Sequence, residues 1–234
     1  MMLSLLLLPF LWLAPQETKA VQKPPLPEFN RHVLAVLRSY PTDGTHRYYW
    51  PRGKDGRGWG GNARDLHYRG KLVAKGDPKG RGYCCGLTFE VFVQAYERAC
   101  KARKQPFLIP GVADGKALLR LRGLWFGSDG NRKTLARTIE QEKLGRLIPK
   151  FEDVRPGDFV QLWRRSGSGH SVIFLSWLRK KQKIVGLRYW STQTSTKGIG
   201  ERVEYFATGP KDKRGVDPKQ LYIARVELPK RKPK

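Results

Sequence analysis

Residues 82–103 read GYCCGLTFEVFVQAYERACKAR, and they contain the clearest helical pattern of the chain. Apolar residues recur in it at every fourth position, at Leu87, Val91, Ala95 and Ala99. This spacing places them on one face of an α-helix, so we predict a central helix over residues 86–103. The preceding glycine-rich loop places Cys84 at the N-terminus of this helix, where the helix dipole favours a thiolate.

Outside this stretch, shorter patterns predict three more helices and a sheet. We expect a helix over residues 32–39 with Asn30 as its N-cap, and two more over 113–121 and 134–147, separated by a loop over 123–131. Apolar residues further along predict five strands, over residues 159–163, 171–178, 184–191, 203–207 and 221–228. The chain is therefore expected to be an α+β domain whose central helix packs on an antiparallel sheet of about five strands.

His170 stands where a loop meets one of these strands, in the segment GHSVIFL of residues 169–175. Because an imidazole can take the proton of a thiol nucleophile, Cys84 and His170 are the candidate catalytic pair. The cysteines form no CxxC pair, and no Cys/His cluster has the spacing of zinc ligands, so we expect neither a metal nor a cofactor.

A third polar residue is expected beside the imidazole ring, where it would orient the ring as in a catalytic triad. If the two strands after His170 form a hairpin, His170 lies opposite position 190 or 191. That pairing brings Ser191, Thr192 or Gln193 to the ring, since strand register is uncertain by a residue or more. We favour Gln193 because its amide oxygen can accept a hydrogen bond from a ring N–H, with Ser191 as the alternative.

Three short motifs resemble those of NlpC-type papain-like cell-wall cysteine peptidases. Residues 83–88, YCCGLT, resemble the Asp-Cys-Ser-Gly-Phe/Leu-Val nucleophile motif of that family. Residues 155–160, RPGDFV, resemble its Pro-Gly-Asp-Leu-Val motif, and residues 169–173, GHSVI, resemble its Gly-His-Val-Gly-Ile motif. The related CHAP amidohydrolase/peptidase group shares this arrangement of motifs. The resemblance covers residues 82–193, with the motifs in the family's order.

The resemblance implies a papain-like fold in which Cys84 is the nucleophile and His170 the general base. It also implies an oxyanion hole that includes the backbone N–H of Cys84. The chain departs from the family pattern at Tyr83, which replaces Asp, and at Cys85, which replaces Ser. In addition, neither His nor Asn stands clearly in the third position of the triad.

The N-terminus resembles an export signal. Residues 1–20 contain an apolar run that is too short to span a bilayer and end in Thr-Lys-Ala, a passable cleavage site. We therefore predict a signal peptide over 1–20, a proline-rich linker over 21–29, a single domain over 30–228 and a basic tail over 229–234. A secreted or periplasmic location, in the cell envelope, follows from this prediction.

The chain is strongly basic, with 46 Lys and Arg against 20 Asp and Glu and a formal charge of +26. Such a charge indicates polyanionic surroundings. For an exported protein these are peptidoglycan or another anionic envelope polymer. Nucleic acid becomes the leading partner if the protein is not exported.

These patterns predict an exported cysteine hydrolase that cleaves an amide or peptide bond, in peptidoglycan peptides, through a Cys84–His170 acyl-enzyme. We expect Tyr83 and Trp59 to bind substrate, with the aromatic residues 48–50 and Trp125 as further candidates for the groove. Two alternatives stay open. One is a non-catalytic protein of the same fold that binds a polyanion, and the other is a Cys–His acyltransferase with an amine acceptor in place of water.

Overall fold

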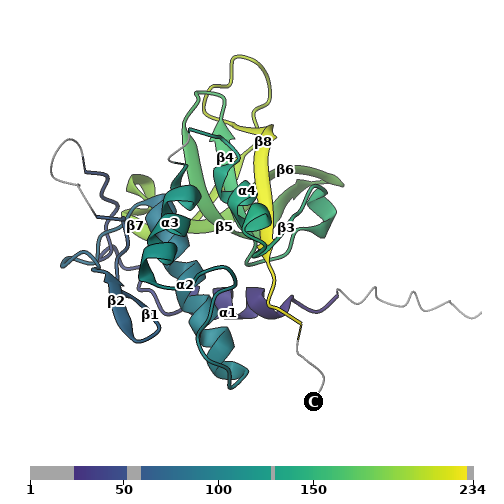
Figure 1. Ribbon diagram of the computed structural model, residues 1–234. Coiled ribbons are helices and arrows are strands. Elements are labelled where there is room, and N and C mark those ends of the chain that lie inside the picture. The colour runs from purple at the N-terminus through teal and green to yellow at the C-terminus, as the bar shows by residue number, and fades with distance from the viewer. Residues whose placement is uncertain (1–23, 52–58, 128–129, 231–234) are drawn as a thin grey trace, which may run out of the picture.

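The computed structural model describes residues 24–51, 59–127 and 130–230, and it has α+β architecture. In these residues four α-helices lie beside two antiparallel sheets, one of six strands and one of two (Figure 1). The helices are α1 (Glu28–Leu37), α2 (Cys84–Ala102), α3 (Gly115–Phe126) and α4 (Thr134–Gln141). The predicted signal peptide lies outside the described residues, and so do residues 21–23 of the predicted linker and 231–234 of the predicted tail. Within the described part, no helix is both long enough and apolar enough to cross a membrane.

The large sheet has the strand order β3-β8-β4-β5-β6-β7, and each pair of neighbours is antiparallel. Its strands are β3 (Gly145–Leu147), β4 (Phe159–Arg164), β5 (Gly169–Lys180), β6 (Lys183–Gln193), β7 (Gly198–Tyr205) and β8 (Val216–Val226). The five predicted strands correspond to β4 through β8, so the prediction of an antiparallel sheet is confirmed. The sixth strand, β3, extends the sheet at the β8 edge. The hairpin of β1 (Leu66–Tyr68) and β2 (Lys71–Ala74) forms the small sheet.

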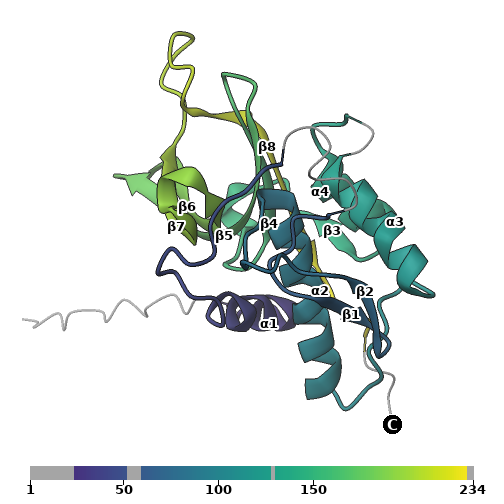
Figure 2. The same cartoon turned by 90° about the vertical axis from the view of Figure 1, so that its left-hand side faces the viewer.

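The helix α2 forms the centre of the main core, as its four-residue repeat predicts. Leu87, Val91, Ala95 and Ala99 are each 0% exposed. The helix contacts β5 and β6 of the sheet and also α1, which lies beside it (Figure 2). A second core lies on the opposite face of the sheet. Successive side chains of β4 point to opposite faces, so this strand contributes to both cores. Phe159 belongs to the helix-side core, whereas Val160 and Leu162 belong to the other.

The first helix begins earlier than the sequence predicts. It starts at Glu28, inside the segment expected to be a linker, and Phe29 is buried in the main core. The prediction that Asn30 is an N-cap is wrong, because Asn30 lies within the helix. Its side-chain amide donates to the Asp158 carboxylate at 2.7 Å instead. A buried partner 128 residues away thus replaces the local capping bond.

The predicted loop over residues 123–131 is wrong in its first half, where α3 continues to Phe126. The left-handed Gly127 (φ 79°) ends this helix, whereas Gly123 lies inside it. Trp125 is therefore a fully buried core residue rather than part of a groove. Its indole N–H donates to the Thr88 hydroxyl at 3.2 Å.

The predicted helix over residues 134–147 is also wrong in its second half. Helix α4 ends at Gln141, and β3 follows it and pairs with β8. Lys143 adopts a left-handed conformation (φ 55°) at the point where the chain reverses. Because lysine rarely adopts this conformation, the residue types carry no signal for the break.

Candidate active site

Cys84 and His170 line one surface groove of about 400 Å³, although they lie 86 positions apart in the sequence. The groove has aromatic walls formed by Tyr48, Trp50, Phe126 and Trp163. Its polar lining side chains include Asn131, Thr134, Gln161 and Ser171. No Asp, Glu, Lys or Arg lines the groove in the described part of the chain. The site therefore presents a thiol and an imidazole to a mostly uncharged, aromatic cleft.

Cys84 is the first residue of α2, and the local backbone explains why. Tyr83 is extended (φ −128°, ψ 165°), and its N–H donates to the Gly61 carbonyl at 3.1 Å. One turn later, a Cβ atom on Gly86 would lie 2.2 Å from the Gly60 carbonyl oxygen. Glycine at position 86 thus lets the loop that contains Gly60 and Gly61 lie directly against the first turn of the helix. This contact fixes where α2 begins.

The buried carboxylate of Glu90 holds the same loop over the helix. It accepts hydrogen bonds from the backbone N–H groups of Ala63 at 2.6 Å and Arg64 at 3.2 Å. Its other oxygen accepts from the Tyr40 hydroxyl, and from Gln94 at 3.2 Å. Burial raises the pKa of Glu90 from 4.5 to about 7, although these donors oppose the shift. The loop is therefore anchored by a carboxyl group that titrates near neutral pH.

We expect Glu90→Gln to change how the stability of the protein depends on pH. Because the folded-state pKa is raised, the Glu90 contribution to stability is greatest below pH 4.5 and is lost as pH rises through 7. Gln does not titrate, so between pH 4.5 and 8 the free energy of unfolding of the variant should rise relative to wild type by about 3 kcal/mol. Urea denaturation of both proteins at several pH values measures this difference. A difference that stays constant with pH would contradict the assignment.

The surroundings of Cys84 favour its thiolate. A hydrogen bond from the Cys85 thiol is the largest influence that holds the pKa of Cys84 well below 9.0, and burial opposes it. The charge of protonated His170, a hydrogen bond from its ring and one from the Ser171 backbone N–H act in the same direction as Cys85. The pKa of Cys85 is raised well above 9.0, since this thiol is the hydrogen-bond donor to Cys84 and is itself buried. Proton-donating groups thus surround the Cys84 sulfur.

His170 is 7% exposed and sits at the start of β5. Its ring meets the Tyr189 ring edge-on, with the centroids 5.8 Å apart. The hairpin register differs from the predicted one, because Ile173 lies opposite Trp190. Continuing this register places His170 opposite Gln193, three residues beyond position 190. The turn lies later in the chain than the prediction requires, because Lys180 pairs with Lys183 and only residues 181 and 182 separate the two strands.

Gln193 belongs to a buried polar network behind the imidazole ring. Its amide oxygen accepts a hydrogen bond from the Tyr189 hydroxyl at 2.9 Å, and that hydroxyl also lies 2.5 Å from Glu204. Arg164 binds the Glu204 carboxylate through two hydrogen bonds, at 2.7 and 2.5 Å. Burial raises the pKa of Glu204, but hydrogen bonds from Arg164 and Tyr189 more than offset it and leave the pKa below its usual value. The network therefore contains an ionised carboxylate held by an arginine.

Two buried nitrogens at this network have no hydrogen-bond partner among the described residues. They are Nε2 of His170 and the amide nitrogen Nε2 of Gln193. Ser191, the alternative third residue, instead donates its hydroxyl to the backbone carbonyl of Ser171 at 2.9 Å. Thr192 has a buried hydroxyl that also lacks a partner. Of the three candidates, Gln193 is the one connected to the residue that contacts the His170 ring.

The predicted substrate-binding residues Tyr83 and Trp59 do not line this groove. Tyr83 is 7% exposed and lies in an aromatic cluster, 4.6 Å from the Trp50 ring and 5.4 Å from the Trp59 ring. Trp59 lines a neighbouring depression together with Tyr49. Tyr83 thus supports the groove wall from behind, while Trp50 forms its surface.

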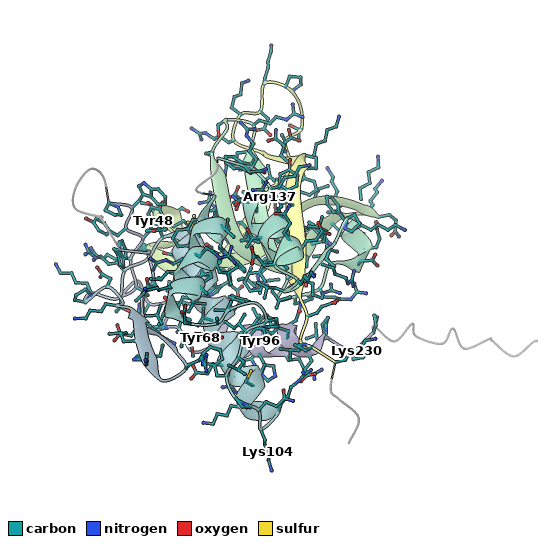
Figure 3. The ribbon with its side chains drawn as sticks, in the orientation of Figure 1. Tyr48, Tyr68, Tyr96, Lys104, Arg137 and Lys230 are labelled. Atoms are coloured by element: carbon teal, nitrogen blue, oxygen red, sulfur yellow. The ribbon has the colours of Figure 1, made fainter. Side chains whose placement is uncertain are left out.

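Of the other aromatic candidates, Tyr48 (labelled in Figure 3) and Trp50 do line the groove. Burial, followed by the nearby Cys84 and Cys85 sulfurs, raises the pKa of Tyr48 to about 12. The phenol therefore keeps its proton beside Cys84. Gln161 and Trp163 also line the groove, although the sequence did not indicate them. They reach it because β4 pairs with β5, with Gln161 opposite Ser171 and Trp163 opposite Gly169. The apolar sequence of β4 predicts a buried strand and gives no sign of this role.

In the described part of the chain, no three His, Cys, Asp or Glu side chains gather as metal ligands would, and the three cysteines are free thiols. Comparison of the chain with protein-family models, with curated proteins and with solved structures finds no match.

Proposed function

We propose that this protein is a papain-like cysteine hydrolase that cleaves an amide bond through a Cys84–His170 acyl-enzyme. The observation that carries the proposal is the pairing of Cys84, whose pKa is lowered, with His170 in one groove. Structural cysteines at helix starts are usually inert and lie away from clefts, whereas an activated thiol with an imidazole partner is the arrangement of a nucleophile. The three NlpC-like motifs support the same conclusion, since two of them supply this pair.

The chemistry follows from the two side chains. The Cys84 thiolate attacks the carbonyl carbon of the substrate, and the C–N bond breaks as protonated His170 gives its proton to the leaving amine. A thioester joins the acyl group to Cys84. Neutral His170 then takes a proton from water, whose oxygen attacks the thioester. The products are a carboxylic acid and the restored Cys84–His170 pair.

Charge that develops on the carbonyl oxygen needs hydrogen-bond donors. The backbone N–H of Cys84, at the N-terminus of α2, is one candidate, as the family resemblance implies. We assign the Tyr48 hydroxyl as the second donor because it lines the groove and its raised pKa keeps it protonated. This phenol would be the side-chain donor of the oxyanion hole.

Gln193 is proposed as the residue that orients His170. In the productive arrangement its amide is turned by half a rotation, which exchanges the positions of its oxygen and nitrogen. The amide oxygen then accepts from Nε2 of His170, and the amide nitrogen donates to the Tyr189 hydroxyl, which donates in turn to Glu204. This arrangement also requires the amide and the ring to move closer together, because no hydrogen bond joins Gln193 to His170 in the structure.

An amide in the peptides of peptidoglycan is the proposed substrate. The uncharged groove with aromatic walls suits a peptide backbone, and the basic surface of the protein suits an anionic envelope. The proposed location is accordingly secreted or periplasmic, as the N-terminal sequence predicts. No cofactor is assigned a role in this mechanism.

Digestion of purified peptidoglycan tests the proposal. The protein lacking residues 1–20 is incubated with peptidoglycan of several cross-link types, and released fragments are identified by mass spectrometry. We expect new peptide termini at one kind of amide bond, and none with the Cys84→Ala variant. Added glycine amide distinguishes transfer from hydrolysis, because a transferase would conjugate it to the fragments. Failure to cleave any amide, by a protein whose Cys84 reacts as an ordinary thiol, would overturn the proposal.

A further inference from the structure

A second, strongly basic cleft of about 600 Å³ lies next to the groove. Its lining includes five basic residues, Arg132, Arg164, Arg165, Lys213 and Lys219, and a single acidic one, Asp217. The cleft lies between the turn that joins β4 and β5 and the loop before β8, which stand together at the top of Figure 1. Nitrogen-tipped side chains surround these loops in Figure 3.

Most of the positive charge in this cleft is not neutralised by the protein. Two of the five basic residues are offset, since Arg164 is paired with Glu204 and Arg165 lies within electrostatic reach of Asp212. In the part of the chain that the structure describes, the guanidinium of Arg132 donates to the neutral amide oxygen of Gln220 at 2.6 Å and forms no ion pair. Within the described residues, Lys213 and Lys219 form no ion pair. An open cleft with several uncompensated cations attracts an anionic ligand.

The cleft is also held in shape without a ligand. The backbone N–H of Arg165 donates to the Gly215 carbonyl at 3.1 Å, and that of Ser166 donates to the Lys213 carbonyl at 2.8 Å. These bonds tie the β4–β5 turn to the loop before β8. The guanidinium of Arg132 also lies 5.0 Å from the centre of the Trp163 ring, which limits its movement. Binding an anion here costs less ordering than it would on a free surface.

The β4–β5 hairpin connects the two clefts. At its base, Trp163, Gly169 and His170 line the groove of Cys84, and its tip, from Arg164 to Gly167, lines the basic cleft. Trp163 links them directly, because its indole N–H donates to the Arg132 carbonyl at 2.8 Å. A single extended ligand can therefore occupy both.

We propose that the basic cleft binds an anionic segment of the same polymer whose amide reaches Cys84, with phosphate or carboxylate groups repeated along the segment. The inference rests on the proposed function for the link to cleavage, while the anion site itself stands on the cleft. Arginine and lysine side chains bind both of these anions, and arginine can hold either one through two hydrogen bonds. The uncharged groove leaves the recognition of anionic groups to the cleft.

Two triple variants with the same change in net charge test the site. The cleft variant carries Arg132→Gln, Lys213→Gln and Lys219→Gln. The control carries Arg179→Gln, Lys180→Gln and Lys183→Gln, on either side of the turn that joins β5 to β6, at the end of β5 away from the cleft. Binding of fluorescent short-chain polyphosphate and of poly-glutamate is measured by anisotropy over a range of salt concentrations, and thermal unfolding checks that both variants are folded.

We expect the affinity of the cleft variant to fall by about tenfold or more, and that of the control to change less than about threefold. The slope of log K against log salt concentration should also be smaller in the cleft variant, by about two. The stronger of the two probes identifies phosphate or carboxylate as the preferred group. Equal losses in both variants would mean that general charge explains binding, and would overturn the site. Tighter binding of oligodeoxythymidine than of either probe would assign the cleft to nucleic acid instead. Because no cleavage is needed, this result is independent of the digestion assay.

Discussion

Cys84→Ala is expected to lower amide hydrolysis by about 10,000-fold or more, since the acyl-enzyme cannot form without the Cys84 sulfur. His170→Ala should cost a similar factor, because the thiolate loses its partner and the leaving amine loses its proton donor. The double variant should be no worse than either single variant, because the two side chains act as one unit. Rates of fragment release from peptidoglycan measure all three.

Cys100→Ala is the matched control for the loss of a thiol. Cys100 lies on the same helix, but it is buried in the main core and away from the groove. We expect this variant to keep hydrolysis within a few-fold of wild type and to lose a little stability, as for other small core truncations. Cleavage that persists in Cys84→Ala, or that disappears in Cys100→Ala while the protein stays folded, would place the nucleophile elsewhere.

Asp158→Ala is expected to destabilise the fold by about 3–5 kcal/mol, the usual cost of removing one partner from a buried ion pair. Asp158 is 0% exposed, and its carboxylate accepts two hydrogen bonds from Arg225, at 2.8 and 2.7 Å. It also accepts from the Asn30 amide at 2.7 Å and from the Arg155 backbone N–H at 2.8 Å. The substitution leaves the Arg225 charge buried without its ion-pair partner, and it removes one of the two hydrogen bonds that the Asn30 amide of α1 donates.

Urea denaturation of Asp158→Ala measures this loss, with Glu227→Ala as its control. Glu227 pairs with Arg146 at 2.8 Å, and both side chains are about half exposed (49% and 52%). Removing an exposed pair should cost less than about 1 kcal/mol. Equal losses of unfolding free energy in the two variants would mean that the buried Asp158–Arg225 pair stabilises the fold no more than the exposed pair does.

The parts of the fold that follow from local sequence were predictable. The four-residue repeat of α2 and the apolar segments of β4 through β8 reflect which side chains face a core, and a single sequence shows these patterns directly. Positions that depend on distant partners were not predictable. Asn30 was expected to cap a helix, but Asp158 holds its side chain. Lys143 breaks a helix because β3 pairs with β8, a contact between segments about 80 residues apart.

The candidate site shows the same division. Cys84 and His170 could be identified because each stands at the end of a recognisable element. Their neighbours depend on strand register and loop packing, so the sequence did not indicate Gln161 or the network behind Gln193. Tyr83 and Trp59 were expected to bind substrate, Tyr83 because it precedes Cys84 in the nucleophile motif and Trp59 because it is an aromatic loop residue. The structure places Tyr83 behind the groove and Trp59 beside it, because aromatic residues also pack against one another.

The rate of iodoacetamide labelling of the folded protein between pH 5 and 9, with each modified cysteine located by mass spectrometry, tests whether Cys84 and His170 form an activated pair. We expect rapid labelling of Cys84 alone below pH 7, because its pKa is lowered, and a shift of that reaction toward the pH range of an ordinary thiol, about 8.5, in His170→Ala. Slow labelling of Cys84 only above pH 8, unchanged by His170→Ala, would contradict an activated Cys84–His170 pair.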